Sequence, residues 1–187
     1  MLSLIVRMIV CVWRAWRAPR TTSMEESVLR FRVMPGDLDF NAHMNNGRYL
    51  SLMDLGRTDL VIRAGLLGAA WRRRWRPVLG TATIRFRRSL RPFQRFELRT
   101  RLLGWDDKWF VFEQRFVAEG EIYALALARG VFVGRRGSVS PSETLEEAGL
   151  TIPSPTLPAY VNEWSRADVD AWRAATAPVS EAAVLAR

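Results

Sequence analysis

Cysteine and histidine are almost absent from this chain. Its 187 residues hold one cysteine, Cys11, and one histidine, His43. A single cysteine excludes an internal disulfide, and one cysteine with one histidine cannot supply the four ligands of a usual structural zinc site. We therefore expect no metal and no cofactor, and a reducing compartment, the cytoplasm.

A long apolar run is also missing. The apolar stretch at the N-terminus is broken by Arg7 and stops after Trp13, short of the roughly 20 residues that span a bilayer. No small-residue cleavage site follows it, which argues against a signal peptide. Residues 1–23 form an extension with three open interpretations: an interfacial helix, a disordered or artefactual stretch with Met24 as the true start, or a transmembrane anchor. The interfacial helix would have Leu4, Ile5, Met8, Ile9 and Val12 on one side and arginines at 7, 14, 17 and 20.

Acidic residues are outnumbered, so the formal net charge is +9, and arginine supplies almost all of the positive charge. Such a balance suits nucleic acid, an anionic membrane surface or a phosphate-bearing ligand, but it also fits a solvated arginine-rich surface. The arginines are scattered over alternating strand faces without a recognition motif, so we expect no nucleic-acid partner. With 49% hydrophobic residues the chain can bury a core and is expected to be globular.

The first regular elements are a strand and a long helix. After a linker over residues 19–26, "VLRFRVM" (28–34) alternates apolar and basic residues as a strand does. The segment 45–67 then has helical periodicity, and Gly56 in its middle costs about 1 kcal/mol of helix propensity, which favours a close approach to a sheet. The apolar stripe of this helix is Tyr49, Leu52, Met53, Gly56 and Leu60.

Four further segments are rich in β-branched and aromatic residues: 78–90, 94–105, 108–120 and 121–134. Their short connections predict antiparallel hairpins between neighbours. The fold class is therefore α+β: a long central helix wrapped by a curved, mostly antiparallel sheet of about five strands.

We expect residues 24–140 to form this domain and residues 141–187 to form a helical tail. The tail should hold a short helix after Val139 and a second helix around 165–176. Aromatic residues of the tail, namely Tyr160, Trp164 and Trp172, are expected to dock it onto the domain.

The stretch "GDLDFNAHMNNGRYL" (36–50) places many small polar groups where the first strand leads into the central helix. A helix start offers unpaired backbone N–H groups and the positive end of the dipole, which suit an oxyanion. Asp39, Asn41 and His43 are spaced by two, so in an extended turn their side chains would converge on one volume. A base or nucleophile, an orienting donor and an oxyanion site are what hydrolysis of an activated acyl group requires.

These residues resemble the hotdog-fold thioesterase superfamily. "DLDFNAHMNNGRYL" is similar to the signature D-x-D-x-N-x-H-[MV]-N-N-x-x-Y of plant acyl-ACP and bacterial acyl-CoA thioesterases, and to the D-x-D turn of the 4-hydroxybenzoyl-CoA thioesterase group. The apolar N-terminus, the "NNGRYLSLMDLGR" helix and the tryptophan-bearing tail resemble thioesterase superfamily member 6-like proteins. The resemblance covers roughly residues 27–140.

The resemblance implies hydrolysis of acyl-CoA or acyl-ACP to a free acid and a thiol by a homodimer or a dimer of dimers. Asp39 would be the nucleophile or the general base, two alternatives that the sequence leaves open. Asn41 and His43 would orient the thioester or water. The amides of Asn46 and Gly47 would form the oxyanion site.

Further residues have weaker assignments. Asp54 is a second candidate acid on the helix, and Asn45 and Asn46 either serve the site or only cap the helix. His43 by itself could be a packing or capping residue, and Asp37 is expected to shape the turn. The run "WRRRWR" (71–76) is either a solvated loop or a clamp for the CoA phosphates formed by Arg72, Arg73 and Arg74.

Two other functions stay open. A hotdog hydratase or dehydratase would use the histidine, but the glycine- and proline-rich loop typical of those enzymes is missing around His43. A non-catalytic acyl-binding or membrane-associated protein would use residues 1–20 for peripheral membrane contact.

Overall fold

The computed structural model describes residues 2–21 and 25–176, so Met24, the alternative start, lies outside the described residues. It divides into two compact units, residues 1–155 and 156–187. The first unit contains, in chain order, α1 (Leu2–Arg17), β1 (Ser27–Arg32), the short 3-10 helix η1 (Pro35–Asp37), α2 (Asn46–Arg63), α3 (Leu66–Arg73), β2 (Arg76–Phe86), β3 (Arg95–Trp105), β4 (Phe110–Ala118), β5 (Glu121–Gly134), β6 (Gly137–Val139) and α4 (Pro141–Glu147).

The sheet is antiparallel throughout and has the strand order β1-β3-β4-β5-β2, with β6 paired to β5. The expected hairpins β3–β4 and β4–β5 are confirmed. The expected hairpin between β2 and β3 is wrong, because β2 pairs with β5 and β3 pairs with β1. Residues 87–94 instead close over the start of α2: Leu90 is fully buried, and its carbonyl accepts a hydrogen bond from the Met44 amide at 2.9 Å.

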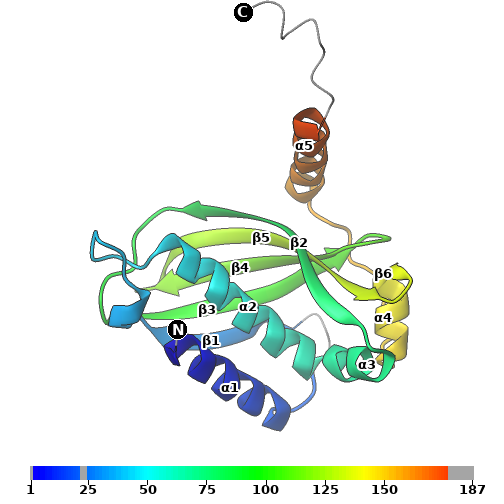
Figure 1. The fold of residues 1–187 in the computed structure, drawn as a ribbon, viewed down its shortest axis with the longest axis horizontal. Helices are drawn as coiled ribbons and strands as arrows, with labels where there is room; N and C mark the ends of the chain where they lie inside the picture. The colour runs from blue at the N-terminus through cyan, green and yellow to red at the C-terminus, as the bar shows by residue number, and fades with distance from the viewer. Residues whose placement is uncertain (1, 22–24, 177–187) are drawn as a thin grey trace, which may run out of the picture. The chain divides into compact units, whose positions relative to one another are not determined.

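Helix α2 lies against the concave face of the sheet, as the α+β prediction requires (Figure 1). Every member of its predicted apolar stripe is buried. The β3 residues on the same side of the sheet are buried with it, namely Phe96, Leu98, Thr100 and Leu102. Gly56 allows this contact, because a Cβ there would collide with the Thr100 hydroxyl and lie 3.0 Å from the Gln114 side-chain nitrogen. The predicted close approach of Gly56 to the sheet is therefore confirmed.

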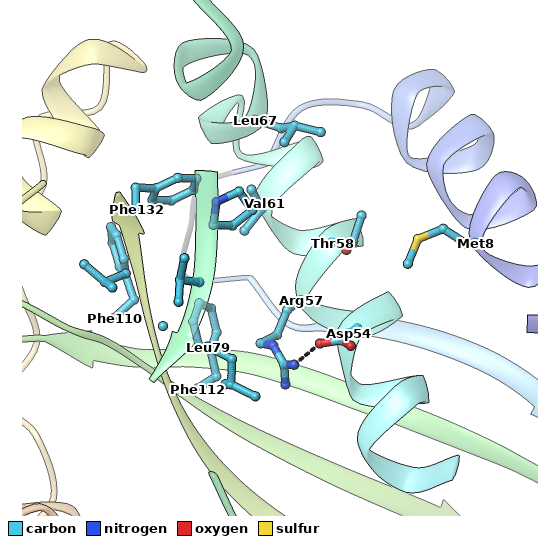
Figure 2. Close-up of a pocket in the computed structure, with 14 residues that line it drawn as sticks. Met8, Asp54, Arg57, Thr58, Val61, Leu67, Leu79, Phe110, Phe112 and Phe132 are labelled. Atoms are coloured by element: carbon cyan, nitrogen blue, oxygen red, sulfur yellow. Dashed lines mark hydrogen bonds and ion pairs between the residues drawn. The ribbon is translucent and has the colours of Figure 1, made fainter. Parts of the chain in front are cut away.

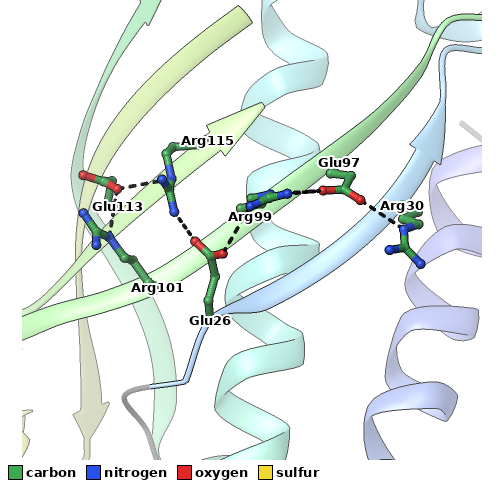
Figure 3. A network of polar contacts seen from close by, with 7 residues as sticks. All are labelled: Glu26, Arg30, Glu97, Arg99, Arg101, Glu113 and Arg115. Atoms are coloured by element: carbon green, nitrogen blue, oxygen red, sulfur yellow. Dashed lines mark hydrogen bonds and ion pairs between the residues drawn. The ribbon is translucent and has the colours of Figure 1, made fainter. Parts of the chain in front are cut away.

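The opposite face of the sheet is ionic. Because successive strand residues point to opposite faces, the neighbours of the buried apolar residues on β3 and β4 point away from α2. Figure 3 shows them linked into one ladder across β1, β3 and β4, which contains Arg30, Glu97, Arg99, Glu26, Arg115, Glu113 and Arg101. The exposure of its members ranges from Glu113, which is buried, to Arg30, which is exposed, and the more exposed pairs contribute only about 0 to 1 kcal/mol each.

Helix α1 packs along α2 (Figure 1). Cys11 and Ala15 are buried, and the Cys11 thiol donates to the Leu55 carbonyl at 3.4 Å. Burial raises the pKa of the Cys11 thiol from 9.0 to about 12. The predicted apolar side of this helix is partly wrong: Leu4 and Met8 pack against the core, whereas Ile5 and Ile9 are exposed. Both sides of the helix are apolar, so periodicity alone could not decide which side faces the domain.

The tail departs from the prediction in one of its helices. Helix α4 begins at Pro141 with Ser140 as its N-cap, as expected, and its cap side chain accepts from the Glu143 amide at 3.2 Å. Helix α5 (Ala159–Thr176), in the second unit, starts six residues before the predicted 165. Over residues 2–21 and 25–176, no helix combines the length and the hydrophobicity needed to cross a membrane.

Candidate active site

The turn between β1 and α2 is held together by two aspartates. Asp39 Oδ1 accepts from the backbone amides of Asn41 at 2.9 Å and His43 at 3.3 Å, and the Asp39 amide donates to the His43 carbonyl at 2.9 Å. Ala42 has a left-handed φ of 56°, so the chain reverses within this turn. The expectation of an extended turn is wrong. The spacing by two therefore does not make the side chains of Asp39, Asn41 and His43 point in the same direction.

Asp37 is the buried anchor of the turn. Its carboxylate accepts from the Met34 amide at 2.9 Å and pairs with Arg7 of α1 at 2.8 Å, with Arg48 at 3.8 Å. The expectation that Asp37 shapes the turn is confirmed. The ion pair with Arg7 also ties α1 to the turn.

The side chains of Asn41 and His43 lie in different surroundings. Asn41 is exposed, whereas His43 is half-buried and lines a polar cavity of about 580 Å³ together with Arg88, Arg91 and Tyr123. Neither Asp39 nor Asn41 lines this cavity. In the single chain His43 thus lines a cavity that is lined by neither the half-buried Asp39 nor the exposed Asn41.

The start of α2 keeps one free amide. Asn45 is the N-cap, and its side-chain oxygen accepts from the Gly47 amide at 2.8 Å, while its carbonyl accepts from the Arg48 amide at 2.8 Å. Among the described residues the amide of Asn46 has no hydrogen-bond partner. Of the two amides predicted for the oxyanion site, only that of Asn46 is therefore unengaged.

A second, apolar cavity of about 380 Å³ lies farther along α2 (Figure 2). Its walls come from α2, α3, the edge strand β2, and strands β4 and β5, with Met8 from α1. The apolar lining residues are Val61, Leu67, Val78, Leu79, Phe110, Phe112, Val131 and Phe132. Such a lining suits a hydrocarbon group.

Asp54 and Arg57 supply the charges of the apolar cavity, and they form an ion pair one turn apart on α2. Arg57 also donates to the Gln114 side-chain oxygen at 2.5 Å, and Gln114 in turn donates to the Thr100 hydroxyl and the Met53 carbonyl, each at 2.9 Å. Burial lowers the pKa of the Arg57 guanidinium, and the charge of Asp54 opposes this shift. This chain of hydrogen bonds fixes Arg57 between helix and sheet.

Gln114 is the residue of this network that sequence reasoning missed. In "FVFEQRF" it occupies an inward position between Phe112 and Phe116, where alternation predicts an apolar side chain. A polar residue at an apolar position of a strand was the available signal, since buried polar groups require partners.

The arginine run lies on a helix. Residues 71–73 are the last turn of α3, so the alternative of a solvated loop is wrong for them, and Arg74 ends the helix with a left-handed φ of 58°. Arg73 pairs with Glu147 of α4 at 2.7 Å, and Arg72 pairs with the same carboxylate at 3.6 Å. No lining of the polar or the apolar cavity includes these arginines, so phosphate binding by Arg72, Arg73 and Arg74 stays a prediction. Over the part of the chain that is described, no cluster of three or more histidine, cysteine or acidic side chains could hold a metal ion.

Comparison with known proteins identifies the family. A model of the thioesterase-like superfamily matches residues 33–179. Protein THEM6 of Xenopus laevis is 42% identical over 135 residues, and that of Danio rerio is 43% identical over 133 residues. These matches cover 71% and 70% of this chain but only 63% and 64% of the two relatives.

Solved structures share the fold. The probable thioesterase YbaW of Escherichia coli has a TM-score of 0.57 at 22% identity, covering 65% of this chain and 97% of its own. The hypothetical protein SAV2348 of Staphylococcus aureus, solved in complex with CoA, has a TM-score of 0.61 at 13% identity, covering 76% of this chain and 95% of its own. The sheet wrapped around α2 is thus the hotdog fold, and the chain belongs to the thioesterase-like superfamily.

Proposed function

We propose that this chain is a thioesterase that hydrolyses acyl-CoA or acyl-ACP to a free acid and a thiol. The observation that carries the proposal is the Asp39–His43 turn at the start of α2, in a chain of the thioesterase-like superfamily. An acid, an imidazole and a free helix amide are the groups that thioester hydrolysis uses.

Asp39 is the proposed nucleophile or general base. Its Oδ1 is occupied by the Asn41 and His43 amides, while its second carboxylate oxygen has no partner among the described residues. As a nucleophile, that oxygen would attack the thioester carbonyl and form a mixed anhydride, which water would then hydrolyse to the free acid, restoring the carboxylate and protonating the thiolate. As a base, it would take a proton from the water that attacks the carbonyl. Asn41 and His43 would orient the thioester or the water, the Asn46 amide would stabilise the oxyanion, and the C–S bond would break to release the thiol.

The apolar cavity would hold the acyl group. Asp54, at its edge, follows Asn46 by eight residues, or about 12 Å along the helix axis, so an acyl chain could run from the turn along α2. CoA as the carrier is supported by the Staphylococcus aureus protein of the same fold, which was solved with CoA.

The test is hydrolysis of a panel of acyl-CoA and acyl-ACP thioesters of increasing chain length, followed by released thiol. We expect turnover of thioesters with apolar acyl groups, because the cavity lining is aliphatic and aromatic. Absence of turnover on every carrier and chain length would overturn the proposal and favour an acyl-binding protein.

We also propose that the protein is a homodimer or a dimer of dimers. Strand β2 is an edge strand of eleven residues, of which eight are exposed, and an uncovered edge of this length is a template for pairing with another chain. Phe40, beside Asp39, is 96% exposed, so an aromatic side chain at the candidate site is in contact with solvent in the single chain. Light scattering should give a mass of about 43 kDa, twice the 21.4 kDa of one chain, or a further doubling of it; a monomer mass would contradict this assembly.

A further inference from the structure

The outer side of α1 is an exposed apolar stripe. Its members are Ile5, Val6, Ile9, Val10, Trp13 and Trp16, which we call the α1 stripe; each side chain is between 46% and 76% exposed. The opposite side of the helix, with Cys11 and Ala15, is buried against the domain. The stripe therefore does not stabilise the fold of the single chain, and contiguous exposed apolar surface of this kind usually binds something.

Helix α3 lies near one end of the α1 stripe. Trp16 and Arg20 line the same surface hollow as Gly68 and Arg72, which places the C-terminal end of α1 beside α3, as Figure 1 also shows. Trp71 on α3 is 85% exposed. The segment "WRRRWR" thus places Arg72 in the same hollow as Trp16 and Arg20 and adds one more exposed tryptophan on α3.

Unpaired basic residues accompany the stripe. Arg14, Arg17 and Arg20 are exposed, and among the described residues none of them has an acidic partner. The Arg17 guanidinium lies 4.2 Å from the centre of the Trp13 ring. Long arginine side chains beside tryptophans can keep their charge in water while their stems lie on apolar surface.

We propose that the α1 stripe, with Trp71 of α3, docks on the surface of an anionic lipid bilayer. Aliphatic side chains would enter the boundary of the acyl chains, tryptophans would lie at the headgroup level, and the arginines would meet lipid phosphates. A second copy of the chain fits the stripe less well than a bilayer does, because a two-fold contact through the stripe would place the unpaired arginines of both copies close together, where like charges repel. Lipid phosphate complements these charges.

This surface is connected to the apolar cavity. Met8, on the side of α1 that faces the domain, and Leu67 of α3 both line that cavity. Helices α1 and α3, which would touch the bilayer, therefore also form part of the wall of the apolar cavity. A lipophilic group that leaves the membrane would reach the protein at this cavity. The docking itself requires no thioester chemistry and is tested without any acyl thioester.

Vesicle flotation of the full chain tests the proposal. One set of vesicles contains phosphatidylcholine alone and the other contains phosphatidylcholine with phosphatidylglycerol. We expect binding to the anionic set to be at least about tenfold tighter and to weaken with salt. Ile9→Ser/Trp13→Ser should lower this binding by about tenfold or more, whereas the control Val28→Ser/Ile122→Ser, at exposed apolar positions of the sheet, should leave it unchanged.

Two double variants that lose the same charge separate the effect of the α1 arginines from the effect of net charge. Arg14→Gln/Arg17→Gln should remove most of the preference for anionic vesicles, and Arg135→Gln/Arg136→Gln, with the same change of charge, should keep it. The proposal is overturned if wild type does not bind anionic vesicles or if the stripe variant binds as well as wild type. It is also overturned if the stripe variant has a smaller oligomeric mass, because the stripe would then be covered by another copy of the chain.

Discussion

Asp39→Asn should lower the rate of thioester hydrolysis by about 10³-fold while leaving the fold intact. The substitution removes the carboxylate that would act as nucleophile or base, an effect typically between about 10² and 10⁴ in rate. It keeps a side-chain oxygen that can accept from the Asn41 and His43 amides, so the turn should survive. The measurements are kcat and KM on the best thioester of the panel, together with thermal unfolding.

Asp39→Ala is the matched comparison. It removes both the charge and the acceptor of the two amides, so it should be as inactive as Asp39→Asn and also less stable by about 1 kcal/mol. Full activity of Asp39→Asn would mean that Asp39 only forms the turn. In that case loss of activity in Asp54→Asn would assign the chemistry to the acid at the apolar cavity.

Local patterns predicted the helix that carries the site. The apolar stripe placed the correct side of α2 against the sheet, and the short polar residues before the first turn narrowed the N-cap to Asn45 or Asn46, of which the structure has Asn45. The alternation of apolar and charged residues along β3 is also visible in the sequence, and it matches the face toward α2 and the face that carries the ionic ladder. These features depend on neighbours within a few residues, which is why the sequence alone revealed them.

Features that depend on distant partners were not predicted. The pairing of β2 with β5 joins segments far apart in the chain, and no local signal distinguishes it from a hairpin with β3. The reversal at Ala42 was hidden because alanine, unlike glycine, does not signal a left-handed backbone. Asp37 could be assigned to the turn, but its partner Arg7 belongs to an extension whose packing the sequence left open.

The narrow contact between α2 and the sheet connects the stability of the fold to the position of the site. Gly56 lies where Thr100 and Gln114 approach the helix, and Gln114 also holds the Arg57 guanidinium at 2.5 Å. A side chain at position 56 must displace these groups or push the helix away. The turn that begins α2 and the apolar cavity along it would then shift together.

Gly56→Ala is expected to destabilise the protein by about 3 kcal/mol or more, because overpacking a close contact and breaking the buried hydrogen bonds of Gln114 both add to the cost. The control is Gly68→Ala on α3, where the nearest atom to a new Cβ is the flexible end of Arg72 at 3.7 Å. There the gain in helix propensity should stabilise the protein by about 0.5 to 1 kcal/mol. Urea unfolding of both variants measures the difference. Equal stability of the two would show that α2 does not approach the sheet at Gly56 as closely as the structure has it.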